Sequence, residues 1–191
     1  MSLFRVAVSF LLVIFLSACV ASSRSSWQVK TGSRTTLAFS GKGAAAGIMM
    51  DSYIGGSGAA IGIAIDEGIA KTIAESLQKK SPEFNFISLV NQQLAAQSKR
   101  SRKLACSEGA LQVVVDTYGF HTFASKDDDV TAWLKMRFTC NGKDTLINYP
   151  ADFPAPKLAE LKAVKTNPDV AYSLLHDAVA ELVLVWDEGL K

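Results

Sequence analysis

Few side chains of this sequence have the type and spacing that catalysis or metal binding requires. The two histidines, His121 and His176, belong to no H-x-H or HExxH motif, and the chain has no G-x-S-x-G motif. His176 falls on the polar side of a predicted helix, so we expect it to be exposed. His121 shares strand parity with Val115 and would be buried if Gly119 introduces no bulge. We therefore predict structural histidines, no catalytic residue, no metal site and no enzymatic activity.

Two other segments suggest ligand binding but lack the required pattern. Gly56–Gly62 misses the third glycine of G-x-G-x-x-G and has no GK[ST] ending, so we expect no nucleotide there. The run Asp127-Asp128-Asp129 lacks the alternation with which calcium loops direct their oxygens inward. We interpret this run as a charged hairpin tip, and we expect no cofactor.

The N-terminus has the pattern of an export signal. Arg5 precedes a mostly apolar run, Val6–Phe15, which is about half as long as the ~20 residues that span a bilayer. A basic start, a short apolar run and small residues at its end are typical of a secretory signal. The run leads into Leu16-Ser17-Ala18-Cys19.

These four residues resemble the lipobox of bacterial lipoproteins, Leu-(Ala/Ser)-(Gly/Ala)-Cys, at every position. The resemblance implies that residues 1–18 are a signal peptide that is removed. Cys19 would then be the N-terminus, carrying a thioether-linked diacylglycerol and acyl chains such as palmitate that anchor it in the lipid bilayer. The alternatives are an ordinary cleaved signal with a chance cysteine and a buried core segment. Residues 19–33 would be the lipidated cysteine and a flexible tether. In lipoproteins of this type, an aspartate directly after the lipidated cysteine retains the protein in the inner membrane. Position 20 is a valine, which favours the outer membrane over the inner one.

The remaining cysteines, Cys106 and Cys140, would enter an oxidising periplasm. We predict a disulfide between them, with two buried thiols as the alternative. A metal site is disfavoured, because no histidine lies near them at ligand spacing.

Composition supports one globular domain over residues 34–191. The chain has 191 residues, of which 49% are hydrophobic, with 20 basic and 18 acidic side chains. This length can bury a core. The net charge of +2 is too small for the cationic field of a nucleic-acid binder.

Periodicity predicts an α+β domain. Strand patterns occur at 34–40, 84–87, 111–120, 130–140 and 144–149, with the hairpin signal Asn141-Gly142 before the last. Helical patterns begin at Ala59, Leu89 and Leu158, and a C-terminal amphipathic helix follows Asn167-Pro168. Its predicted stripe is Ala171, Leu174, Leu175, Ala178, Leu182, Val185 and Trp186. We expect a mostly antiparallel sheet with helices packed on one face.

The Gly-rich segment 43–65 contains two small-xxx-small pairs, Gly43/Gly47 and Gly58/Gly62. Such pairs allow two backbones to approach closely. Helix packing inside the domain is the favoured interpretation, with self-association and shallow insertion into lipid as alternatives. Asp51, Asp66 and Glu67 disfavour full burial in a membrane.

A basic cluster, Lys99, Arg100, Arg102 and Lys103, is a candidate contact for anionic envelope components. A solvated surface loop is the alternative.

By order of elements alone, residues 34–187 resemble small envelope lipoproteins. These include auxiliary lipoproteins of ABC-type lipid transport, the lipopolysaccharide-assembly lipoprotein and curli-secretion-type lipoproteins. The resemblance implies a non-catalytic accessory that binds an envelope protein in assembly or transport. The alternative is a self-associating or membrane-inserting lipoprotein that uses residues 43–65, and a homo-oligomer is compatible with both.

Overall fold

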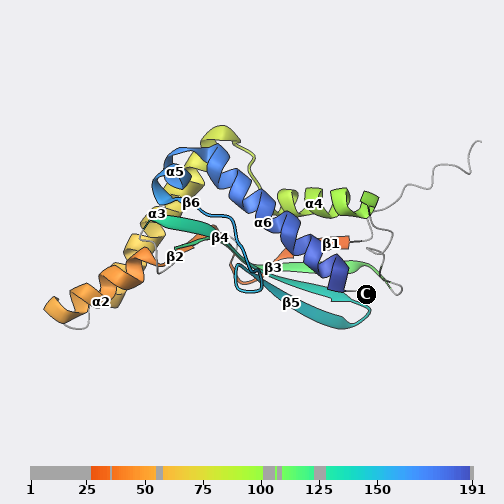
Figure 1. Cartoon of the computed structure of the whole chain (residues 1–191), viewed down its shortest axis with the longest axis horizontal. Helices are drawn as coiled ribbons and strands as arrows, with labels where there is room; N and C mark the ends of the chain where they lie inside the picture. The colour runs from red at the N-terminus through yellow and green to blue at the C-terminus, as the bar shows by residue number, and fades with distance from the viewer. Residues whose placement is uncertain are drawn as a thin grey trace, which may run out of the picture.

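The computed structural model describes residues 27–34, 36–54, 58–100, 106, 109–122 and 128–189. Five helices and six strands in these ranges form an α+β fold around a mixed, mostly antiparallel sheet (Figure 1), which confirms the predicted α+β class and the mostly antiparallel sheet. The predicted signal peptide, Cys19 and residues 20–26 of the predicted tether lie outside the described residues.

The centre of the sheet is an antiparallel meander of β3 (Leu111–Thr122), β4 (Asp129–Cys140) and β5 (Lys143–Tyr149). Between β4 and β5, Asn141 and Gly142 have φ values of 52° and 73°. These are the left-handed conformations of a two-residue hairpin turn, so the predicted turn is confirmed.

Two short strands run along the free edge of β3 and parallel to it. β1 (Trp27–Thr31) pairs with Leu111–Val115, and β2 (Ala38–Ser40) pairs with Gly119–His121. β1 therefore lies within residues 19–33, for which the sequence predicts only a tether. Its residues form a strand only by pairing with β3, about 80 positions away in the sequence, and local sequence patterns do not indicate such a pairing.

A bulge at Asp116 corrects the expected orientation of His121. Val115 pairs with Met136 and Thr117 pairs with Lys135, so Asp116 is an extra residue in β3. The extra residue reverses the alternation, and Phe120 instead of His121 follows Val115 into the core. His121 is half-buried, with its ring 6.3 Å from that of Trp133.

The helices are α2 (Lys42–Ile54), α3 (Gly58–Lys80), α4 (Phe86–Arg100), α5 (Leu161–Thr166) and α6 (Pro168–Gly189). The strand predicted at residues 84–87 is wrong. The side chain of Asn85 accepts a hydrogen bond from the amide of Ile87 at 2.9 Å and so caps α4. The helix predicted to begin at Leu158 begins only at Leu161, because residues 159–160 form strand β6 against β4 before α5.

The C-terminal helix α6 packs on the sheet as a structural element. Its buried side chains contact β4 and β5, and the ring of Trp186 stacks on that of Phe138 at 5.0 Å. The predicted stripe is correct except at Val185, which is 40% exposed. Val179 and Val183 are buried instead, because a helix held between a sheet and α4 buries a wider arc than one stripe.

Cys106 and Cys140 form a disulfide, as predicted, with Cα atoms 5.5 Å apart. The bond joins the end of β4 to the segment that leads from α4 into β3. Lys99 is exposed near the end of α4, whereas residues 101–105 of the basic cluster and the side chain of Arg100 lie outside the description.

Candidate functional site

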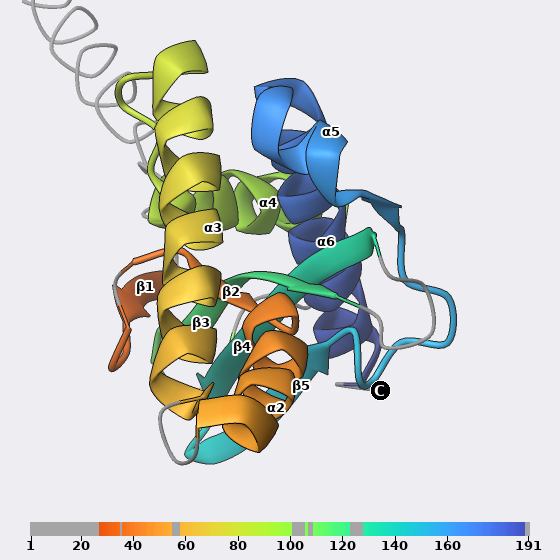
Figure 2. The same ribbon diagram turned by 90° about the vertical axis from the view of Figure 1, so that its left-hand side faces the viewer.

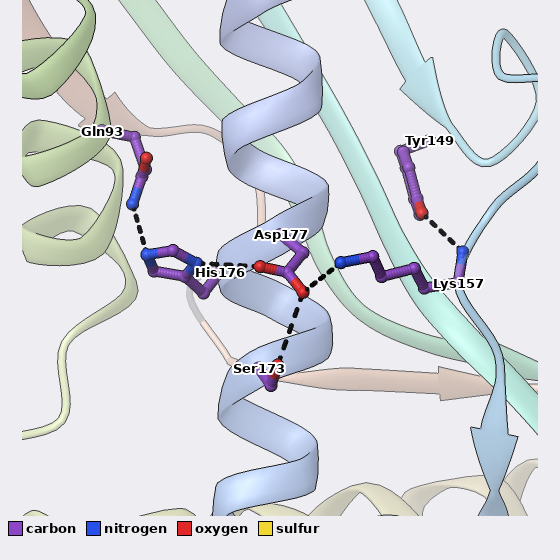
Figure 3. Close-up of polar contacts among 6 residues, drawn as sticks. All are labelled: Gln93, Tyr149, Lys157, Ser173, His176 and Asp177. Atoms are coloured by element: carbon purple, nitrogen blue, oxygen red, sulfur yellow. Dashed lines mark hydrogen bonds and ion pairs between the residues drawn. The ribbon is translucent and has the colours of Figure 1, made fainter.

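The two histidines lie on different elements, His121 on β3 and His176 on α6. His176 belongs to a polar cluster that joins α6 to its neighbours (Figure 3). The amide nitrogen of Gln93 on α4 donates to Nε2 at 2.8 Å, which leaves the ring proton on Nδ1. Nδ1 in turn donates to Asp177 at 3.1 Å. His176 is therefore partly covered, and not fully exposed as predicted.

Asp177 is the centre of this cluster. Its carboxylate accepts from Lys157 at 2.7 Å and from the hydroxyl of Ser173 at 3.4 Å, in addition to His176. Burial acts to raise the pKa of Asp177, but the hydrogen bonds from Lys157 and His176, together with the charge of Lys157, outweigh it, so the pKa is lowered. The hydrogen bond between Lys157 and Asp177 also raises the pKa of Lys157.

The hydrogen bonds around Asp177 connect three parts of the fold and have a structural role. Both ring nitrogens of His176 are occupied by Gln93 and Asp177, so the ring has no nitrogen directed at the hydroxyl of Ser173. The backbone amide of Lys157 also donates to the hydroxyl of the buried Tyr149 at 3.1 Å. The cluster thus fixes α6 to α4 and to the segment after β5, and it does not form a nucleophile–base pair.

The strongest candidate for an interaction site is formed by α2 and the first turns of α3, residues 42–54 and 58–66, which we call the α2–α3 hairpin. α2 packs on α3, and the later part of α3 packs on β2, α5 and α6. The buried residues Ala70, Ile73 and Leu77 belong to that later part. The hairpin projects past the end of the sheet, on the left of Figure 1 and towards the viewer in Figure 2.

Glycines bring the two helices of the hairpin into backbone contact. A Cβ on Gly43 would collide with the carbonyl of Gly62, and a Cβ on Gly62 would collide with that of Gly43. Gly47 and Gly58 meet in the same way, and a Cβ on Gly47 would lie 2.8 Å from the carbonyl oxygen of Gly58. The predicted role of these glycines in packing within the domain is confirmed.

Each helix of the hairpin caps the other. Asp66 of α3 accepts from the amides of Gly43 at 2.7 Å and Gly41 at 3.2 Å, at the start of α2. Asp51 of α2 accepts from the amide of Gly58 at 3.3 Å, at the start of α3. Amides at a helix start have no partner within the helix, so these carboxylates satisfy donors that would otherwise need water.

The hairpin is built from an internal repeat, which our sequence reasoning missed. Residues 43–51 read GAAAGIMMD and residues 58–66 read GAAIGIAID, with six of nine positions identical. The two copies of G-x-x-x-G-x-x-x-D pair antiparallel, so that the first glycine of each meets the second glycine of the other. Comparing the chain with itself at an offset of 15 residues reveals this signal.

Large apolar side chains cover the outside of the hairpin. Ile48 is 75% exposed, Met49 68% and Ile63 61%, and Met50 and Ile65 are exposed as well. Ile48 and Ile63 occupy equivalent positions in the two repeats and flank a groove of about 370 Å³. Gly43, Gly47 and Gly62 form its floor, and Asp51 and Asp66 lie along it.

A second cavity, of about 550 Å³, lies between β1, the end of α3 and the start of α4. Phe86 and Tyr118 stack at its side with ring centroids 4.3 Å apart. Burial raises the pKa of Tyr118. This cavity is lined mainly by apolar side chains with a few polar ones, among them Gln78, Glu83 and Asn85.

The described part of the chain holds no group of three or more His, Cys, Asp or Glu side chains placed to bind a metal ion. None of its helices combines the length and hydropathy that crossing a membrane requires. Comparisons of the chain with protein-family models, curated proteins and solved structures found no match.

Proposed function

We propose that this chain is a non-catalytic, lipid-anchored protein of the bacterial envelope that binds a protein partner through the α2–α3 hairpin. The anchor would be Cys19 in the outer membrane, with the domain facing the periplasm. The observation that carries the proposal is the exposure of Ile48, Met49 and Ile63 on one projecting element. Apolar surface gathered in this way is typical of sites that are covered by a partner.

The path of the chain supports a hairpin directed away from the anchor. Seven residues separate Cys19 from Trp27, a reach of at most about 28 Å. Trp27 pairs with Leu111 and Ser40 with His121, so roughly 30 Å of sheet lies between them, followed by roughly 20 Å of α2. In Figure 1, β1 and α2 lie towards opposite ends of the long axis. A molecule tethered at Trp27 can therefore present the hairpin to the periplasm.

The end near the tether suits a charged bilayer surface. Trp27 donates to the side chain of Asn91 on α4 at 3.2 Å, and the exposed Lys99 lies two turns further along that helix. Contact of the basic cluster with anionic headgroups is part of the proposal. So is the packing of helices on one face of the sheet, which is supported by the contacts of α6 with β4 and β5 and of α4 with β1.

Two experiments test the proposal. Cys19→Ser in the full chain should leave an unprocessed precursor that incorporates no labelled fatty acid, and normal maturation of this variant would refute the anchor. A photo-crosslinking residue at Ile48 should form protein adducts in intact cells, whereas one at Leu146, an exposed apolar position on β5, should not. If both positions label protein to the same low extent, the hairpin is not the interaction element.

A further inference from the structure

We infer that the partner of the α2–α3 hairpin is the same hairpin of a second copy of this chain. The two hairpins would form a four-helix bundle about a twofold axis. The inference rests on the proposed function only in taking the hairpin as the interaction element, and it names the partner that the proposed function leaves open.

The first argument is that the repeat already recognises itself within one chain. Residues 43–51 pack on residues 58–66, which have nearly the same sequence. Each copy supplies two glycines and the aspartate that caps the other. Because the glycine faces are already paired within the chain, a second copy would meet the outer faces of the two repeats, which carry the exposed isoleucines.

The second argument is the local symmetry of the exposed surface. Ile48 of the first repeat corresponds to Ile63 of the second, and Met50 corresponds to Ile65. The more exposed pair, Ile48 and Ile63, stands on the two sides of the groove whose floor is glycine. In a twofold contact the same surface is used by both subunits, and the isoleucines of one hairpin can enter the groove of the other.

The third argument is the polarity of the surface. The carboxylates of Asp51 and Asp66 already accept hydrogen bonds from amides of their own chain. A second hairpin therefore needs to supply no cation to satisfy them.

The test uses two differently tagged full-length copies expressed together in intact cells. A photo-crosslinking residue replaces Ile48 or Ile63 in one copy, and Leu146 or Leu184 in matched controls, which are exposed to 47% and 44%. We expect adducts containing both tags from the two hairpin positions and not from the controls. Formation of the Cys106–Cys140 disulfide in every variant reports that the domain has folded.

Substitutions then separate the outcomes. Ile48→Asp and Ile63→Asp place like charges across the contact, so the yield of two-tag adducts should fall by about tenfold or more, and Leu184→Asp should leave it unchanged. Because both isoleucines are exposed, these variants should still fold; Ile48→Asn provides a milder second test. Adducts with other proteins only would overturn the inference and leave the proposed function standing. Absence of any protein adduct from hairpin positions would overturn both.

Discussion

The carboxylate of Asp66 accepts a hydrogen bond from the backbone amide of Gly43, with Oδ1 2.7 Å from the nitrogen. This contact joins two helices that also touch through glycine backbones, and it does so at the base of the hairpin, next to the sheet. The other carboxylate oxygen of Asp66 accepts a hydrogen bond from the amide of Gly41 at 3.2 Å. One side chain of α3 thus holds the start of α2, whose packing is mainly on α3.

Replacement of Asp66 by alanine should loosen α2 before the rest of the domain. Loss of a capping side chain typically costs about 1 kcal/mol, a factor of roughly five in a local opening equilibrium. Amide hydrogen exchange in α2 should accelerate by about that factor in Asp66→Ala and much less in Asp66→Asn, which keeps an acceptor. Glu67→Ala, at the exposed next position, is the control. Equal exchange in Asp66→Ala and Glu67→Ala would show that the cap does not hold α2.

Two glycines of α3 should respond in opposite ways to the same substitution. A Cβ on Gly62 would collide with the backbone of Gly43, whereas nothing lies within 4 Å of a Cβ on Gly68. Overpacking costs about 1–3 kcal/mol, while replacing an exposed helical glycine by alanine gains up to about 1 kcal/mol. Gly62→Ala should therefore accelerate exchange in α2, and Gly68→Ala should leave it unchanged or slower. If Gly62→Ala protects α2 as well as the wild type does, the close approach is not required.

The ion pair of Asp177 predicts a loss of stability in acid. The pKa of this carboxylate is lower in the folded chain than its ordinary value of 3.8, because Lys157 and His176 outweigh burial. A lowered pKa stabilises the fold above the unfolded-state value, and this contribution disappears as the pH falls through the folded value. The difference in unfolding free energy between wild type and Asp177→Asn should thus shrink below about pH 4.

Urea unfolding of the full chain at several pH values measures this difference. Lys157→Met should show the same convergence with wild type in acid, because it removes the other partner of the pair. A gap between wild type and Asp177→Asn that is as large at pH 2 as at pH 6 would contradict the assignment.

Local patterns were sufficient for the elements whose neighbours are close in sequence. The alternation of β3 and β4, the Asn141-Gly142 turn and the start of α6 at Pro168 all follow from spacing and turn chemistry. β1 could not be found in this way, because Trp27–Thr31 become a strand only by pairing with Leu111–Val115. The bulge at Asp116 is similarly invisible, and it decides which face His121 occupies.

The candidate site was predictable in part. The glycine spacing in residues 43–65 indicated close packing, which the contact of Gly43 with Gly62 bears out. The roles of Asp51 and Asp66 were misjudged as charges alone, because capping of one helix by the other depends on their antiparallel arrangement. The repeat at an offset of 15 residues was present in the sequence and would have suggested that arrangement.

The final helix provides a test of the core with an internal control. Leu175 and Leu182 are completely buried, whereas Val185, from the same predicted stripe, is 40% exposed. Truncation of a buried leucine to alanine costs about 2–5 kcal/mol, out of a total stability of about 5–15 kcal/mol. For a chain of this size, Leu175→Ala and Leu182→Ala should each lower the Tm by roughly 5–20 °C. Val185→Ala should change it by no more than about 2 °C, as is usual for exposed positions. Thermal unfolding of the purified full chain, followed by circular dichroism without any partner, measures all three. If the leucine variants melt with the wild type, α6 does not close the core and would have to be an element that docks elsewhere.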